Sequence, residues 1–205
     1  MNIDIVNDRE YNLWEGERVR LRAMVGDDWK TILRFSPDCN GDRLVNFGIE
    51  LPKTEEQIRE FVEKYRDFRN SDTMKMFAIE NKQGEYVGGI NIQRVNHKNG
   101  TFSCGMRLFQ PYRNNGFGEE AFRIALRYAF YEMRLQKCNS GCVDINEASI
   151  RLHKNIGFKE EGLRRRSIYF NGQFYGDMLF GITREEFEEN DSRFLAEKDK
   201  EENES

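Results

Sequence analysis

The loop that decides the fold of this chain reads Leu108-Phe109-Gln110-Pro111-Tyr112-Arg113-Asn114-Asn115-Gly116-Phe117-Gly118. A strand-like run over 101–108 precedes it, and a run with helical periodicity over 119–133 follows it. Backbone N–H groups in the first turn of a helix lack partners inside the helix and carry partial positive charge. Glycines let an anion approach those donors, because no side chain stands in the way. The stretch therefore predicts a binding site for a phosphate or a pyrophosphate.

Several phosphate-containing ligands could bind at such a site. The chain contains no G-x-x-x-x-G-K-[ST] pattern, which excludes a P-loop. Gly116, Gly118 and Ala121 satisfy G-x-G-x-x-A, but a dinucleotide fingerprint places its first glycine directly after the strand. Here the run 109–115 intervenes. Taken alone, the glycines fit equally well a loop that merely turns the chain.

A second motif farther along the chain makes the glycine loop more specific. It reads Asn146-Glu147-Ala148-Ser149-Ile150-Arg151-Leu152-His153-Lys154-Asn155-Ile156-Gly157-Phe158. Together with Arg113-x-x-Gly116-x-Gly118 it resembles the acyl-CoA signature of the GNAT N-acetyltransferase superfamily. The resemblance covers roughly 17–187. It is closest to the RimJ/RimL-like branch, which includes the ribosomal-protein alanine acetyltransferases and the spermidine acetyltransferases.

Length and composition bound the class of protein. The chain has 205 residues and 38% hydrophobic content, enough for one domain with a substantial core. Its net charge of −4 argues against a general nucleic-acid binder. There is no apolar run long enough to span a membrane and no secretory signal, so we expect a cytoplasmic protein with neither a membrane nor a nucleic-acid partner. Four scattered cysteines predict reduced thiols rather than a disulfide framework or a metal site.

The acidic residues gather at the C-terminus. The run 184–205 carries ten acidic and four basic residues, a net of −6, which leaves +2 for 1–183. We therefore divide the chain into an N-terminal lead-in over 1–16, one N-acetyltransferase domain over 17–187 and a charged tail over 188–205.

Hydrophobic periodicity and turn residues predict the elements before the glycine loop. Thr54 and Gln57 form a capping box at the start of one helix. We expect a strand over 17–22, a helix over 28–35, a loop over 36–52, a helix over 54–68, and three antiparallel strands over 74–80, 86–95 and 101–108.

After the loop we expect a helix over 119–133, a strand over 137–143, a helix over 146–155 and a hairpin of strands 160–169 and 173–182. The strands 101–108 and 137–143 flank a helix, so they should run parallel through a right-handed crossover. Gly157 is a typical C-terminal cap and Asn171-Gly172 a strong two-residue turn. The order βααβββαβαββ predicts an α/β fold: a mixed sheet with helices on both faces, which matches the element order of the GNAT fold.

The resemblance also implies how the cofactor, acetyl-CoA, is bound. The parallel strands would splay apart after a bulge near Leu108, and the pantetheine arm would lie in the gap. Its implied contacts are the backbone of Met106, Arg107 and Leu108, the side chain of Asn146, and neighbouring Ser149. Backbone N–H groups of Arg113, Asn114, Asn115, Gly116, Phe117 and Gly118 would hold the pyrophosphate, and Lys154 would contact a phosphate. No metal is implied.

The catalytic assignments are less complete. His153 stands where many relatives have a tyrosine that protonates the departing thiolate; a charged histidine can do this, but a structural or binding role also fits. The strand 101–108 carries no carboxylate, unlike that of many relatives. Asp144 and Asp177 are alternative bases, although buried or capping roles fit both. Family geometry places the acceptor pocket around Phe35, Asn46 and Phe47.

These features predict an acetyl-CoA-dependent N-acetyltransferase. It would move an acetyl group to a primary amine, on a protein N-terminus, a polyamine or another small molecule, by direct attack on the thioester. Relatives often form homodimers, so a homodimer is one expectation for the assembly. The alternatives are a non-catalytic acyl-CoA-binding or sensing protein and, more weakly, a dinucleotide-binding oxidoreductase.

Overall fold

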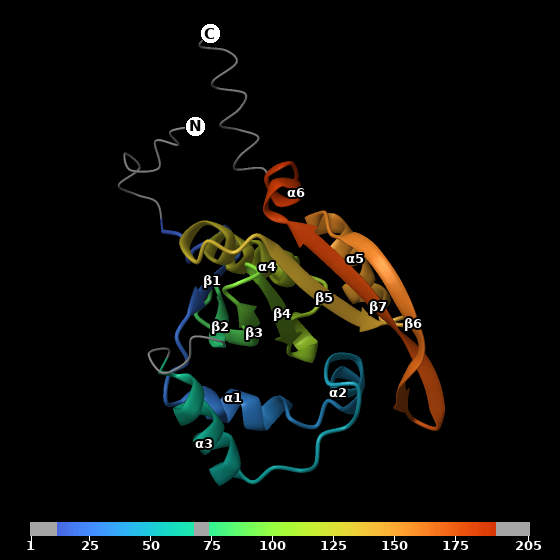
Figure 1. Ribbon diagram of the computed structural model, residues 1–205. Helices are drawn as coiled ribbons and strands as arrows, with labels where there is room; N and C mark the ends of the chain where they lie inside the picture. The colour runs from blue at the N-terminus through green and yellow to red at the C-terminus, as the bar shows by residue number, and fades with distance from the viewer. Residues whose placement is uncertain (1–11, 68–73, 192–205) are drawn as a thin grey trace.

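The computed structural model describes residues 12–67 and 74–191. Its centre is a seven-stranded sheet with strand order β1-β2-β3-β4-β5-β7-β6 (Figure 1). The strands are β1 Val19–Arg22, β2 Lys75–Asn81, β3 Tyr86–Asn96, β4 Thr101–Leu108, β5 Lys137–Val143, β6 Lys159–Phe170 and β7 Gln173–Thr183. Neighbours pair antiparallel except β4 and β5, which run parallel as predicted.

Helices cover both faces of the sheet, which confirms the predicted α/β architecture (Figure 1). One face carries α4 and α5, and the other carries the three N-terminal helices. The helices are α1 Asp28–Phe35, α2 Cys39–Val45, α3 Glu55–Tyr65, α4 Phe117–Arg127, α5 Glu147–Ile156 and α6 Arg184–Glu188. A π-helical turn, Tyr128–Glu132, ends α4 within the predicted helix 119–133.

Local sequence signals set several element ends as predicted. Thr54 and Gln57 exchange both hydrogen bonds of the capping box at the start of α3. Gly157 ends α5 in the left-handed region, with φ 105°. Asn171 and Gly172 both have positive φ and join β6 to β7 through a two-residue turn. Phe68 of the predicted second helix lies outside the described residues.

The prediction of a loop over 36–52 is wrong for its first part, because α2 forms there. Asn40-Gly41 favours a turn, but the Asp38 side chain accepts a hydrogen bond from the Gly41 N–H (2.9 Å) and caps a short helix. Ion pairs from α2 to Arg107 and Arg113 then hold the helix against β4 and the loop that follows it. Tertiary contacts thus override a weak local preference.

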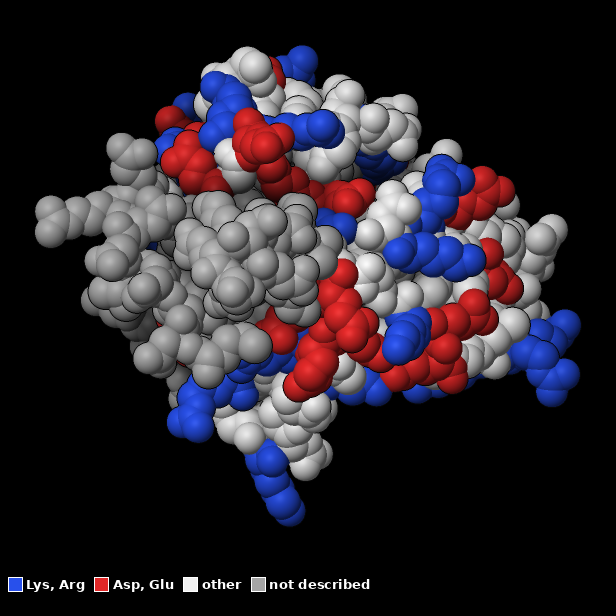
Figure 2. Space-filling model, turned by 90° about the horizontal axis from the view of Figure 1, so that it is seen from above, with Lys and Arg blue, Asp and Glu red and all other residues white. Residues whose placement is uncertain are grey.

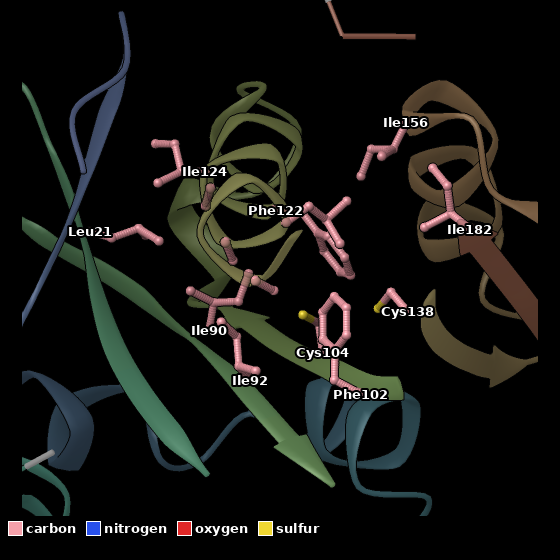
Figure 3. Close-up of a cluster of buried hydrophobic side chains, with 14 of the residues drawn as sticks. Leu21, Ile90, Ile92, Phe102, Cys104, Phe122, Ile124, Cys138, Ile156 and Ile182 are labelled. Atoms are coloured by element: carbon pink, nitrogen blue, oxygen red, sulfur yellow. The ribbon is translucent and has the colours of Figure 1, made fainter. Parts of the chain in front are cut away.

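The main core lies between the sheet and α4 (Figure 3). Phe122 of α4 points toward Phe102 of β4, Ile124 lies on the side of the helix nearer to Leu21 of β1, and all four side chains are buried. A smaller cluster of Met24, Val62 and Ala78 lies beneath α1 and α3. Cys104, Cys138 and Cys142 are buried free thiols, whereas Cys39 is an exposed one.

Two buried residues hold the segment that follows β7 against the rest of the domain. Phe187 packs in the main core, and Asp191 forms a two-point ion pair with Arg127 of α4. The predicted charged tail therefore begins with an anchored segment, and 192–205 lie outside the described residues. On the face seen from above in Figure 2, acidic and basic side chains alternate over short distances.

Residues 12–67 and 74–191 lack two features that are associated with other classes of protein. None of the helices there is long and apolar enough to cross a membrane. The same residues contain no group of three His, Cys, Asp or Glu side chains placed to hold a metal ion.

Candidate active site

Strands β4 and β5 diverge in the middle of the sheet. Their paired residues end at Ser103 and Asn139, although β4 continues to Leu108 and β5 to Val143. Beyond Ser103 and Asn139 the two strands no longer pair with each other, so their facing backbone groups are open to a ligand. The divergence therefore begins at Ser103, before the position near Leu108 that the resemblance implied, and no register shift accompanies Leu108.

A groove of about 440 Å³ lies over this divergence. It brings together ten of the predicted site residues: Met106, Arg107, Leu108, Arg113, Asn114, Gly116, Gly118, Asn146, Ser149 and His153. Asn115, Phe117 and Lys154 lie outside its lining. The groove extends from the glycine loop, between β4 and β5, to the start of α5, so it can hold an elongated ligand with phosphates at the loop end.

The glycine loop opens α4 as predicted. Gly116 is the N-terminal cap of the helix, with φ 77°, and no side chain hydrogen-bonds this end. A side chain at Gly116 would also collide with the Arg18 guanidinium, whose Nη1 donates to the Asn115 carbonyl (3.4 Å). The loop therefore presents helix N-terminal donors beside an arginine, which suits a phosphate group.

Arg113 links this loop to α2. Its Nη2 forms an ion pair with Asp38, and its Nε donates to the Leu108 carbonyl (3.0 Å). Burial alone would raise the pKa of Asp38, but the Gly41 N–H and Arg113 outweigh it and hold the pKa below its usual range. Arg113 therefore sits at the groove with its charge already partnered by an ionised carboxylate.

Asn146 and Ser149 lie at the other end of the groove, where α5 begins. Asn146 Oδ1 accepts a hydrogen bond from the Ser149 N–H (3.1 Å), so the residue caps α5. An asparagine side chain also has an NH₂ group, and the cap does not use it. Capping and ligand binding by Asn146 are therefore compatible.

His153 is buried behind the groove and stacks on Phe180 at 4.7 Å between ring centroids. Its Nδ1 lies 2.7 Å from the Ser149 carbonyl, which only accepts, so Nδ1 carries the proton. Its Nε2 lies 2.7 Å from the Ser140 hydroxyl, which donates to a neutral ring. Burial lowers the pKa of His153, although the Ser149 carbonyl partly offsets this. The surroundings favour a neutral imidazole.

A second cavity, of about 610 Å³, lies on the α1–α3 side of the sheet. Of the three residues expected at the acceptor pocket, Phe35 and Asn46 line this cavity and Phe47 lines the groove. Tyr86 also lines it, and burial raises the pKa of that hydroxyl far above its usual value. A mostly apolar cavity with a few polar groups is typical of a small-molecule site.

The groove and the second cavity meet at β4. Val45, Gly105, Met106 and Arg107 line both of them. Arg107 forms an ion pair there with the buried carboxylate of Asp42 on α2. Two ligands, one on each side of β4, can therefore approach each other at this strand.

The carboxylates considered from the sequence lie elsewhere. Asp144 Oδ2 accepts from the Gly176 N–H (2.8 Å), and Asp177 pairs with Arg164 at 3.2 Å. Neither residue lines the groove or the second cavity. Each carboxylate instead has a partner in the hairpin of β6 and β7.

Sequence reasoning missed the residues that long-range folding brings to the site. Asp38 and Asp42 belong to a helix that was predicted as a loop, and Ser140 lies in an unremarkable strand. Asn91 and Gln93 of β3 face the second cavity at alternate positions. Along β3 these polar residues alternate with the buried Ile90 and Ile92, as expected for a strand with two different faces. That alternation is the one sequence signal that could have identified them.

Comparison with known proteins identifies the class that this fold and this pair of cavities define. Residues 18–159, more than half of the chain, match the acetyltransferase (GNAT) domain family. The chain belongs to this family and is a GNAT N-acetyltransferase. It is 36% identical, over 86% of its length and 96% of the relative's, to the SPbeta prophage-derived uncharacterized N-acetyltransferase YokL of Bacillus subtilis.

Solved structures show the same fold. The spermidine N-acetyltransferase of Vibrio cholerae, in complex with CoA and spermine, superposes with a TM-score of 0.74 at 19% identity and covers 84% of this chain and 99% of its own. RimJ of Mycobacterium smegmatis, in complex with CoA-disulfide, gives 0.69 at 22% identity and covers 82% and 83%. At these identities the likeness concerns the fold. Family membership favours acyl-CoA over a dinucleotide as ligand of the glycine loop.

Proposed function

We propose that this enzyme transfers the acetyl group of acetyl-CoA to a primary amine by direct attack on the thioester. Acetyl-CoA would occupy the groove, with its pyrophosphate at the glycine loop and its pantetheine arm between β4 and β5. The amine would enter from the second cavity. The observation that carries this proposal is the meeting of both spaces at Gly105, Met106 and Arg107.

Proximity supplies much of the rate enhancement in such an arrangement. Holding an amine against a thioester in a reactive geometry can contribute about 7–11 kcal/mol. The amine must first lose its proton, and water at the mouth of the second cavity can accept it. The attack expels CoA as a thiolate, which takes up a proton after the carbon–sulfur bond breaks.

Direct attack is favoured over a covalent acetyl-enzyme by the state of the thiols. Cys104 and Cys142 line the groove, but both are buried. Burial raises the pKa of Cys142, although the Ser149 hydroxyl partly offsets this, so the thiol stays protonated. A thiol is a poor nucleophile compared with its thiolate. We expect Cys104→Ser and Cys142→Ser to remain active, and intact-mass spectrometry to find no acetyl adduct.

His153 is assigned a positioning role in this proposal. A neutral ring whose Nδ1 proton is held by the Ser149 carbonyl is poorly placed to give a proton to a thiolate. The ring instead fixes the Ser140 hydroxyl at the wall of the groove. His153→Phe should then alter acetyl-CoA affinity and stability more than the pH profile of turnover; loss of the fall in rate at high pH would restore the proton-donor role.

The decisive experiment places a negative charge in the groove. Ala148 is exposed and lines the groove at the first turn of α5. Ala148→Glu should weaken acetyl-CoA binding, measured by calorimetry, about a hundred-fold, because the added carboxylate meets the anionic cofactor. Ala148→Ser is the matched control and should bind as the wild type does.

Turnover is followed with a free-thiol assay over a panel of primary amines. Binding that Ala148→Glu removes, together with thiol release that requires an amine, would support the proposal. Binding without release for any amine would favour a non-catalytic acyl-CoA-binding protein. Equal binding by Ala148→Glu and wild type would mean that acetyl-CoA occupies a different place.

A further inference from the structure

The charges that line the second cavity, called the acceptor cavity from here on, cancel in pairs. Its described lining carries four charged side chains: Asp42, Glu50, Lys53 and Arg107. Asp42 pairs with Arg107, and Glu50 pairs with Lys53 at the exposed mouth. Asn46 also donates to Glu50 (3.0 Å). The described lining therefore offers no carboxylate without a cation beside it.

This pairing matters for a ligand with more than one ammonium group. One amine of such a ligand loses its proton and reacts, but the others stay charged inside the cavity. A buried cation without a carboxylate partner is strongly unfavourable, because desolvation is not offset by an ion pair. The cavity therefore disfavours diamines and polyamines.

The walls of the cavity are apolar on the helical side. Ile32 and Phe35 of α1 and Ile58 and Phe61 of α3 line this part of it, and the nearby Met24 and Met76 of the lining are also apolar. Val45, another apolar residue of the lining, is exposed. Such walls gain free energy by covering hydrocarbon, roughly 25 cal/mol per Å² removed from water.

The floor of the cavity is polar but uncharged. Asn91 and Gln93 lie on one face of β3, opposite Gly105 and Ser103 of β4. Asn91 Oδ1 accepts from the Gly105 N–H (3.1 Å), which orients its amide. Neither Asn91 Nδ2 nor the Gln93 amide hydrogen-bonds any of the residues that the structure describes.

The amides of Asn91 and Gln93 lie against Gly105, where the groove and the acceptor cavity meet. A side chain at Gly105 would lie 3.2 Å from Asn91 Oδ1 and 3.3 Å from Gln93 Nε2, so the glycine makes room for both. Gly105 also lines the cofactor groove. The free amide groups therefore stand beside the position of the attacking amine, where they can bind a group one or two bonds away from it.

We propose that the acceptor is an α-amino amide with an uncharged, apolar side chain, selected by Asn91 and Gln93. The amide of the acceptor would exchange hydrogen bonds with these two side chains, and its side chain would fill the apolar walls. A free α-carboxylate would gain no cation there, because Arg107 is already paired. This proposal rests on the proposed function and identifies its substrate class.

The test compares acceptors of nearly equal shape that differ in charge. Norleucine amide and lysine amide have the same four-carbon side chain, to which lysine amide adds a terminal ammonium group, and norleucine replaces the amide by a carboxylate. We expect kcat/KM for norleucine amide to exceed that for the other two, and for spermidine, about a hundred-fold. A tripeptide amide that begins with norleucine distinguishes a polypeptide acceptor from a small amide.

A charge added at the floor should change this preference. Gln93→Glu gives the cavity a carboxylate with no cation beside it, which would offset the second charge of lysine amide, and should lower the preference for norleucine amide at least ten-fold. Gln57→Glu is the matched control: it adds the same charge at the exposed mouth, and glutamate serves equally well in the capping box. This control should change the preference less than three-fold.

Binding of the same amides to the enzyme–CoA complex, measured by calorimetry, gives a readout without turnover. Equal use or equal binding of lysine amide, or a preference that Gln93→Glu leaves unchanged, would overturn the inference. If no amine is acetylated, the proposed function fails, and the binding preference alone then decides the acceptor class.

Discussion

The cofactor groove and the acceptor cavity share strand β4 but are built from different kinds of residues. The groove takes much of its lining from 104–118 and 140–155, and its phosphate end uses backbone groups and glycines. The acceptor cavity is lined by residues of α1, α2 and α3, by four positions along β3, and by further positions on the neighbouring strands β2 and β4. A common cofactor can thus be held by a local motif, whereas the acceptor is selected by side chains that only the tertiary fold assembles.

The largest expected effect, on the free energy of unfolding, comes from removing the ion pair that lies where the groove and the acceptor cavity meet. Asp42→Ala leaves Arg107 without its buried partner and should lower the free energy of unfolding by about 3 kcal/mol. Chemical denaturation measures this loss. Glu50→Ala removes an exposed ion pair and should cost no more than about 1 kcal/mol. Equal losses would mean that the Asp42–Arg107 pair does not join the regions.

Arg113 offers a sharper comparison, because it faces both the groove and α2. Arg113→Gln should weaken acetyl-CoA binding about ten-fold, equivalent to about 1.4 kcal/mol, by removing a cation near the phosphates. Asp38→Asn removes the competing carboxylate and should leave the affinity unchanged or raise it. Calorimetry at fixed salt separates the two. Equal weakening by both variants would assign Arg113 to holding α2 only.

The buried His153 predicts a pH dependence of stability in the cofactor region. Its pKa in the folded protein is lowered, so the unfolded chain binds the proton more readily. The free energy of unfolding should therefore fall as the pH drops below about 6.5, by at most about 1.4 kcal/mol per pH unit. His153→Phe should flatten this dependence when thermal unfolding is followed from pH 7.5 to 5.5. A variant curve parallel to the wild type would contradict it.

The smallest expected effect comes from removing one of two helix capping boxes, of which only the one at α3 belongs to the acceptor cavity. Thr54→Ala, at the start of α3, and Thr183→Ala, at the start of α6, should each cost about 1 kcal/mol in the free energy of unfolding. Only Thr54→Ala should raise the KM for the amine, because α3 forms a wall of the acceptor cavity. Neither should change the affinity for acetyl-CoA. A raised amine KM in Thr183→Ala would show that the regions are not separable.

Much of the groove could be predicted from the sequence because its determinants are local. Gly116 requires a left-handed conformation, Asn146 caps the helix that it precedes, and Gly157 ends that helix. Each of these depends on residues within a few positions along the chain. The parallel pairing of β4 and β5 followed from the helix between them, because such crossovers are right-handed.

Only the tertiary structure decided α2 and the floor of the acceptor cavity. Helix α2 contains Asn40-Gly41, a turn signal, and is held by ion pairs to residues more than sixty positions away. Burial beside Phe180 makes the neutral form of His153 the favoured one, which its position in a motif could not reveal. Caps, turns and glycine conformations follow from neighbours in the chain, but ion pairs, desolvation and the composition of a cavity depend on which distant residues the fold brings together.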